Sequence, residues 1–309
     1  MAPSPSSPVG AETTGESLRV LLTGANGFIG RHVLENLGRE FDMRVLVRSA
    51  GVFADGVDII RYSDPSESAV DEAVRGVDVI VHAAALLHGS REEMWKANVE
   101  LTERLLSLAT TYGVGHFIYL SSENVGQGQV DLYSASKRAA EAKVTKFPLH
   151  TILRPTVVYG SGDTKYVTRL ARMVQRLPLV PMLGMGRNRF QFLFVEDLVA
   201  VILSTILKPI PGVYVIAGID NVSYREFMQT LMRALGRKRP VLPLPLFMLK
   251  PIAWILDLVM SNPPITPGQL ANLGNDRCYE MAQTCELFGY VPTSLEDGLK
   301  ALVAEEFAG

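Results

Sequence analysis

A tyrosine and a lysine stand four residues apart, at Tyr133 and Lys137, and a serine pair, Ser121-Ser122, ends a predicted strand just upstream. On a helix, residues four apart share one face. A fixed ammonium group favours the phenolate and lowers the pKa of a neighbouring phenol, which suits it to exchange a proton with a substrate hydroxyl. The hydroxyl of Ser122 could then hold the substrate oxygen. This spacing also arises by chance, so a solvated helix face is the alternative.

A glycine-rich turn, Thr23 to Gly30 (TGANGFIG), joins a short apolar run to a helix-like stretch. In that context Gly24 permits a tight turn, Gly27 lets a diphosphate approach the backbone, and Gly30 lets helix and strand pack closely. The free N–H groups at the start of the helix favour an anion. The turn therefore predicts a dinucleotide site, with an ordinary strand–helix turn as the alternative.

The residue that ends the second predicted strand indicates which dinucleotide is bound. An acid there binds the ribose 2′-hydroxyl of NAD(H), and an arginine accommodates the 2′-phosphate of NADP(H). Arg48, followed by Ser49, occupies this position. The charge favours NADP(H), while NAD(H) remains possible because Arg48 could instead stack on the adenine.

The sequence resembles the extended or atypical branch of the short-chain dehydrogenase/reductase superfamily, in particular the NAD(P)-dependent epimerase/dehydratase family. The shared motifs come in the family's order over about residues 18 to 200 and again near the end of the chain. They are TGANGFIG (Thr23 to Gly30), HAAA (His82 to Ala85), NVELT (Asn98 to Thr102), YLSSENV (Tyr119 to Val125), YSASK (Tyr133 to Lys137), LRPTVVYG (Leu153 to Gly160), FVEDLV (Phe194 to Val199) and LFGYVPTSLEDGL (Leu287 to Leu299).

The resemblance implies a role for individual residues. Tyr133 would be the general acid/base, Lys137 would bind the nicotinamide ribose and tune Tyr133, and Ser122 would orient the substrate. The cofactor-binding residues would be Gly24, Asn26, Gly27, Phe28, Ile29, Gly30, Arg48, Asp64, Ala83, Ala84, Ala85, Lys137, Pro155 and Val157. The substrate-binding residues would be Ser122, Glu123, Tyr133 and Arg189. Asn98 would support the sheet and the active site, and Asp197 would anchor a loop.

Alternating apolar runs and helix-like stretches predict an α/β fold, a Rossmann-type doubly wound parallel sheet with a smaller, irregular C-terminal substrate-binding region. We expect a disordered tail over 1–17, an NAD(P)-binding domain over 18–163, and a substrate-binding region over 164–309 with some segments returning to the core. The predicted strands are Leu18 to Thr23, Met43 to Val47, Val57 to Arg61, Val77 to Val81, Phe117 to Ser121 and Leu149 to Leu153. The predicted helices are Ile29 to Gly38, Val70 to Arg75, Glu92 to Thr111 and Tyr133 to Lys146.

Composition narrows the range of partners. The 309 residues carry 30 Lys and Arg against 32 Asp and Glu, so no nucleic acid is expected. The two cysteines are interpreted as free buried thiols, which fits a reducing, cytoplasmic location, and no metal site is expected. The apolar stretch Leu242 to Met260 contains Lys250, Pro251 and Asp257, so it predicts two short helices rather than a transmembrane span, with peripheral membrane contact as the alternative. The resemblance makes a homodimer possible.

Three functions are compatible with these residues. The first is an NAD(P)-dependent sugar-nucleotide epimerase or dehydratase that works by Tyr-assisted hydride transfer at a carbinol carbon. The second is an NADP-dependent reductase or dehydrogenase of an apolar alcohol or ketone, steroid- or isoprenoid-like. The third is a cofactor-binding structural subunit with little turnover. Two departures weaken the first. Phe190 stands where a phosphate-binding arginine is expected, although Arg187 and Arg189 flank it and a one-residue shift of the alignment would restore the contact. The loop from Ser122 to Tyr133 is also short. Glu123 follows Ser122, where the dehydratases carry an acid.

Overall fold

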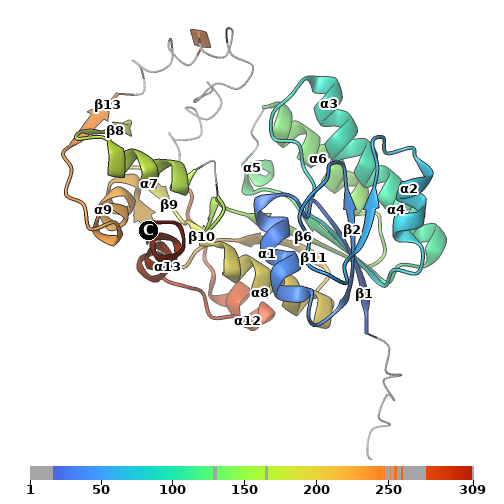
Figure 1. Ribbon diagram of the computed structural model, residues 1–309. Helices are drawn as coiled ribbons and strands as arrows, with labels where there is room; N and C mark the ends of the chain where they lie inside the picture. Colours follow the sequence, from blue (N-terminus) through green and yellow to red (C-terminus); the bar gives the residue numbers. More distant parts are fainter. Residues whose placement is uncertain are drawn as a thin grey trace, which may run out of the picture.

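A seven-stranded sheet, parallel throughout, forms the centre of the molecule, in the order β11-β6-β5-β4-β1-β2-β3 (Figure 1). The computed structural model describes residues 17–127, 131–163, 166–245 and 276–307, together with 247, 251, 254, 255 and 259. The strands are β1 (Arg19–Thr23), β2 (Asp42–Val47), β3 (Asp58–Arg61), β4 (Val79–His82), β5 (His116–Leu120), β6 (His150–Pro155) and β11 (Gly212–Ile216). The predicted fold class is confirmed, and the six predicted strands are all found with slightly shifted ends.

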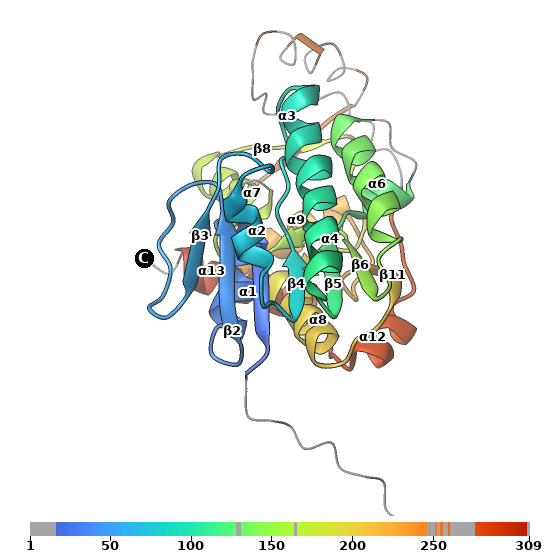
Figure 2. The same ribbon diagram turned by 90° about the vertical axis from the view of Figure 1, so that its right-hand side faces the viewer.

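Helices cover both faces of this sheet, as its apolar strands require. The helices of this part are α1 (Phe28–Leu37), α2 (Ser68–Val74), α3 (Arg91–Trp95), the π-helical turn η1 (Lys96–Glu100), α4 (Leu101–Tyr112), α5 (Glu123–Gly126), α6 (Leu132–Val144), α8 (Val195–Leu207) and α12 (Ala282–Phe288). Along β1, Val20 and Leu22 face the core beneath α1 and α8, while Leu21 faces the core beneath α2, α4 and α6. Figure 2 shows α2, α4 and α6 side by side. Side chains alternate along a strand, so each strand contributes to both cores.

A second group of elements packs beside the sheet and lies at the left of Figure 1. It comprises β7 (Val158–Tyr159), α7 (Val167–Arg176), β8 (Val180–Leu183), β9 (Arg189–Phe190), β10 (Leu193–Phe194), β12 (Val222–Ser223), α9 (Tyr224–Ala234), β13 (Val241–Leu244) and α13 (Leu295–Phe307). Its own core combines aliphatic side chains with aromatic rings, and the rings of Phe192 and Phe227 stack with centroids 4.0 Å apart. We call these elements the C-terminal group.

His32 joins the two parts. It lies on α1, and its Nδ1 is 2.6 Å from a carboxylate oxygen of Glu196 on α8, while its Nε2 is 2.8 Å from the carbonyl oxygen of Ser161, in the loop that follows β7. Burial lowers the pKa of His32, but the two acceptors outweigh that effect and the net pKa is raised. Both ring nitrogens meet an acceptor, so the protonated imidazolium makes the contact best.

Some expectations need correction. The stretch Glu92 to Thr111 is helical, but a π-helical turn interrupts it at η1. Cys278 is exposed and Cys285 is only partly buried, so both thiols are free but the expectation that they are buried is wrong. Most of Leu242 to Met260, and the expected tail apart from Ser17, lie outside the described residues. Within the described part of the chain, no helix is long and apolar enough to cross a membrane.

Candidate active site

The glycine turn brings β1, α1 and β4 into close contact at the carboxyl edge of the sheet. Gly24 has a φ of +79°, and a Cβ there would lie 2.7 Å from the backbone nitrogen of Ala84. A Cβ on Gly30 would lie 2.1 Å from the carbonyl oxygen of Gly24. Both positions therefore require glycine, the first for its backbone conformation and for space, the second for space alone.

The start of α1 is free to bind an anion. Its N-cap residue, Gly27, provides no side-chain hydrogen bond, and the first turn holds no acidic residue. The N–H groups of Phe28, Ile29 and Gly30 therefore have no partner within the helix, and the helix dipole is positive at this end. This turn fits the diphosphate of a dinucleotide, and these are the residues that the sequence predicts for that role.

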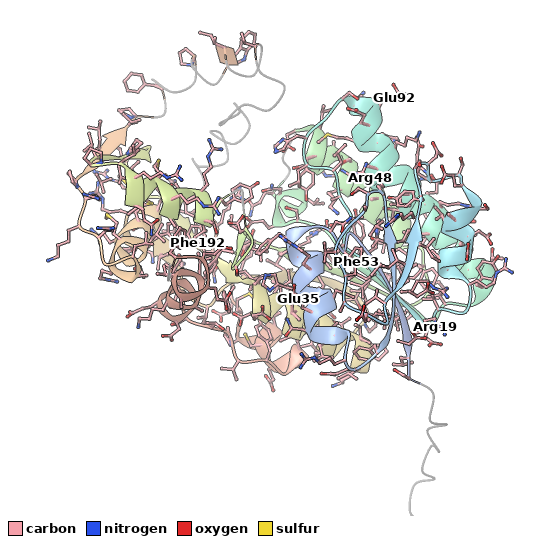
Figure 3. The ribbon with its side chains drawn as sticks, viewed as in Figure 1. Arg19, Glu35, Arg48, Phe53, Glu92 and Phe192 are labelled. Carbon is pink, nitrogen blue, oxygen red and sulfur yellow. The ribbon has the colours of Figure 1, made fainter. Side chains whose placement is uncertain are left out.

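The loop after β2 lies beside the glycine turn. Asn26 Nδ2 donates to the carbonyl oxygen of Ser49 at 3.0 Å, so the two loops are tied together. Arg48 is exposed at the end of β2, and Figure 3 shows it with Phe53, from the same loop, on the sheet side of the molecule. The side chain of Asp64 makes an ion pair with Lys96 at 2.5 Å, and this contact, with bonds from Ser66, holds the pKa of Asp64 well below its usual range. The residue directly after β2 is therefore an exposed arginine, Arg48, and not an acid.

A buried chain of hydrogen bonds joins the glycine turn to the helix that holds Tyr133. Thr23 Oγ1 lies 2.6 Å from His82 Nδ1, and His82 Nε2 lies 2.8 Å from Thr102 Oγ1. Thr102 Oγ1 donates to the Asn98 carbonyl oxygen at 2.7 Å. Asn98 Nδ2 donates to Ser136 Oγ at 2.9 Å.

One arrangement of hydrogens satisfies this chain. Because Thr102 donates to a carbonyl, it accepts from the Nε2–H of His82, and Nδ1 then accepts from Thr23. Thr23 Oγ1 also accepts from the N–H of Ala84 at 3.1 Å. Burial lowers the pKa of His82 to about 3, which keeps the ring neutral as this arrangement requires. Ala83 and Ala84 are thereby fixed directly after β4, and Ala85 follows them in the same loop.

Lys137 and Tyr133 lie on α6, which Asp131 caps by accepting a hydrogen bond from the N–H of Ser134. The Lys137 side chain is fully buried, and its Nζ donates to the Leu120 carbonyl oxygen at 2.6 Å. Burial lowers the pKa of Lys137 to about 7, while Glu141 opposes that change. Burial also raises the pKa of Tyr133. The expectation of a lowered Tyr133 pKa is therefore wrong for this structure: desolvation raises it, with Tyr166 and Asp131 adding to the rise, and the Lys137 ammonium lies over the Tyr119 ring.

Ser122 caps the short helix α5, and its Oγ accepts a hydrogen bond from the N–H of Asn124 at 3.3 Å. The next residue, Glu123, is buried, and one of its oxygens lies 2.6 Å from Nη1 of Arg277. Its other oxygen accepts from the hydroxyl of Tyr279 at 3.0 Å. Arg277 is itself buried. No motif in the sequence identifies Arg277 or Tyr279 as part of the site.

The remaining predicted residues lie on the strands near this cluster. Pro155 is the last residue of β6, and Val157 directly precedes β7. The side chain of Arg189, on β9, is exposed, and its Nε donates to Asn221 Oδ1 at 2.9 Å while its Nη2 donates to the Asn221 carbonyl oxygen. Phe190 is buried in the core of the C-terminal group. Figure 3 shows Phe192 on the side of that group.

Two features together define the class of NAD(P)-binding redox proteins. One is a parallel sheet with an uncapped glycine turn after β1, and the other is a buried lysine one helical turn from a tyrosine beyond β5. The comparison with known families agrees. The profile of the NAD dependent epimerase/dehydratase family matches residues 20–217, and the chain belongs to this family. It is an NAD(P)-dependent oxidoreductase or epimerase.

The relatives with known names include dehydrogenases or reductases and, among the solved structures, sugar-nucleotide epimerases. One is a 3beta-hydroxysteroid-dehydrogenase/decarboxylase (isoform 2) of Arabidopsis thaliana, 24% identical over 92% of this chain, which spans only 61% of that relative's length. Another is a 2-alkyl-3-oxoalkanoate reductase of Stenotrophomonas maltophilia, 28% identical over 94% of this chain and 100% of the relative. Among solved structures, the UDP-glucuronic acid 4-epimerase of Bacillus cereus, in complex with NAD, has a TM-score of 0.74 at 19% identity, over 93% of this chain and 98% of its own. That likeness shows the fold.

Proposed function

We propose that this chain is a reductase, preferring NADP(H), of a ketone on a substrate with an apolar body. The main support is the state of two arginines, Arg189, which is a predicted substrate residue, and Arg277, which contacts another one, Glu123. Arg277 is buried in an ion pair with Glu123, and Arg189 is held by Asn221. A nucleoside diphosphate needs charge-assisted hydrogen bonds, for which arginine is the best donor. Arg277 Nη1 and Arg189 Nε and Nη2 already donate within the protein, which leaves fewer donors for a diphosphate, so an uncharged substrate fits better.

The electrostatics of the site support the direction of reduction. When bound, the nicotinamide cofactor supplies the hydride. Reduction of a ketone also needs a proton at the carbonyl oxygen, and burial raises the pKa of Tyr133, so its phenol holds that proton at neutral pH. Ser122 would donate a second hydrogen bond to the same oxygen. Lys137 would orient the cofactor and assist the return of the Tyr133 proton.

Charge at the cofactor site supports the preference for NADP(H). Arg48 is exposed directly after β2, and Ser49 beside it is bonded to Asn26 of the glycine turn. The Arg48 guanidinium would therefore stand near the adenosine end of a dinucleotide whose diphosphate rests on α1, where a 2′-phosphate requires a cation.

A sugar-nucleotide epimerase or dehydratase is the second candidate. It is favoured by Arg187, an exposed arginine in the turn before β9 that is close enough in sequence to replace Arg189 in binding a diphosphate. In that case the reaction would return the hydride to the same substrate, and the cofactor would show no net change.

The experiment that separates these candidates follows NADPH consumption by absorbance. The purified protein is mixed with NADPH and, in parallel, with a 3-oxosteroid, a long-chain 2-alkyl-3-oxo acid, UDP-glucose and UDP-glucuronic acid. The two UDP-sugars are also tested with NAD⁺ and with NADP⁺, because epimerisation begins with transfer of a hydride from the sugar to the oxidised cofactor. We expect stoichiometric NADPH oxidation with at least one of the two ketones and none with the sugars. An altered UDP-sugar formed without net NADPH oxidation would overturn the proposal in favour of the second candidate. Bound cofactor without turnover of any compound would instead support a structural subunit.

A further inference from the structure

A segment from near the end of the chain, residues 276–280, lies along β9 and reaches the predicted substrate residues. The N–H of Arg277 donates to the Arg189 carbonyl oxygen at 2.9 Å, and the N–H of Arg189 donates to Asp276 Oδ1 at 2.9 Å. Gln191, which is buried, donates from its side chain to the carbonyl oxygens of Tyr279, at 3.0 Å, and Gly218, at 2.8 Å. These bonds fix the path of the 276–280 segment, so the direction of the Arg277 side chain is set by the backbone.

Arg277 forms hydrogen bonds to α5, the short helix that Ser122 caps. Its Nη1 donates to Glu123 Oε1 at 2.6 Å and to Asn124 Oδ1 at 2.9 Å. Tyr279 adds a hydrogen bond to the second oxygen of Glu123, and its own hydroxyl accepts from Gln127 Nε2 at 2.8 Å. A helix as short as α5 has almost no stability of its own. Arg277 and Tyr279 therefore hold three side chains in or next to α5, namely those of Glu123, Asn124 and Gln127. The position of Ser122, which begins α5, depends on these contacts.

The same contacts define what Glu123 can do. Both of its oxygens accept hydrogen bonds, and one of the donors is an arginine, which stays charged at all pH values at which the protein is folded. Elimination of water breaks a C–O bond and forms a C=C bond, and the leaving hydroxyl must collect a proton from an acid. Glu123 stands where the dehydratases carry an acid, but its two oxygens are bonded to Arg277 and Tyr279 and are not free to meet a substrate hydroxyl.

We propose that Arg277 is a positioning residue that determines the outcome of the reaction. By pairing with Glu123, it fixes α5 and Ser122 for proton and hydride transfer to a carbonyl, and it keeps the Glu123 carboxyl group away from a substrate hydroxyl, which loss of water would need to be protonated. The inference rests on the proposed reductase function, because it assigns α5 to carbonyl reduction.

The kinetic test is a double-variant cycle on the ketone that the wild-type protein reduces. We expect Arg277→Met to lower kcat by about tenfold or more, and Glu123→Gln to lower it by a similar factor, with the NADPH Kd unchanged because both residues lie on the substrate side. The double variant should lose no more than the worse single variant, since the two side chains act as one unit. Arg277→Lys should restore part of the rate. Losses that multiply in the double variant, or a kcat of Arg277→Met within about twofold of wild type, would overturn the proposal.

A second measurement does not need a substrate. Amide hydrogen exchange over residues 122–127 should be faster in Arg277→Met and Glu123→Gln than in wild type, and unchanged in Arg176→Met, which removes an exposed arginine from α7. Equal exchange in all four proteins would contradict the positioning role. If no ketone is reduced, the proposed function fails, but this exchange experiment still tests the role of Arg277. If Arg277→Met does not fold, Glu123→Gln is compared with Arg176→Met in the same way.

Discussion

The close approach of Gly24 to the backbone of Ala83 and Ala84 can be measured separately from backbone strain, because a second glycine, Gly113, has a similar backbone conformation and no close neighbour. Gly24 and Gly113 both lie in the left-handed region, at φ of +79° and +71°. A Cβ on Gly24 would meet the backbone of Ala83 and Ala84 at 2.8 and 2.7 Å, whereas a Cβ on Gly113, at the end of α4, would meet nothing within 4 Å. Replacing each glycine by alanine therefore adds the same backbone strain, and only Gly24→Ala adds a clash.

The expected magnitudes differ clearly. Left-handed backbone costs an alanine about 1 kcal/mol, so Gly113→Ala should lower the free energy of unfolding by about that amount. Forcing a methyl group against backbone in a packed site adds roughly 2 kcal/mol, so Gly24→Ala should lose about 3 kcal/mol in total. At about 2.1 cal/mol/K of unfolding entropy per residue, the midpoints of thermal unfolding should fall by roughly 1–2 °C for Gly113→Ala and roughly 4–5 °C for Gly24→Ala.

Thermal unfolding and NADPH titration on the two variants and the wild type provide the assay. Gly113→Ala should bind NADPH as the wild type does, while Gly24→Ala should bind it at least about tenfold more weakly, because β1 and β4 separate beneath the diphosphate site. Equal thermal midpoints for the two variants would refute the close approach of the glycine turn to Ala83 and Ala84.

Three further predictions concern other contacts. Arg48→Asp should shift cofactor preference from NADP(H) toward NAD(H) by about tenfold or more, measured as the ratio of the two Kd values, and an unchanged ratio would show that Arg48 does not bind the 2′-phosphate. His82→Leu should lower the free energy of unfolding by about 2–3 kcal/mol, measured by urea denaturation, because it leaves two buried threonine hydroxyls without their shared partner. The raised pKa of His32 predicts stability that is full below the ordinary histidine pKa of 6.5 and is lost as the pH rises through the folded value. His32→Gln should remove that loss in thermal unfolding measured from pH 6 to 8, and a wild-type protein with no such decline would contradict the pairing.

The sequence predicts the first part of the fold well because the signals there are local. The apolar runs of β1 and β4 and the glycines of the turn each lie within a few residues of the structure that they produce. In contrast, β11 joins the sheet beside β6 from about sixty residues further along the chain. Its pairing depends on contacts that no local pattern records.

The site shows the same division. Tyr133, Lys137 and Ser122 follow from spacing, but Arg277 comes to Glu123 from 154 residues away, guided by bonds to Arg189. The direction in which the pKa of Tyr133 is shifted could not be predicted from the sequence either. The spacing of Tyr133 and Lys137 indicates attraction between phenolate and ammonium, while the desolvation that raises the pKa of Tyr133 depends on how the whole chain folds around it.

The central claim is that Tyr133 delivers the proton that accompanies hydride transfer. The most direct measurement is a single-turnover reaction of Tyr133→Phe with NADPH and the ketone reduced by the wild type, alongside the NADPH Kd of both proteins. We predict that the variant binds NADPH as the wild type does and that its rate of NADPH oxidation falls by about 10²–10⁴-fold. A variant that binds the cofactor equally and oxidises it at the wild-type rate would contradict the account.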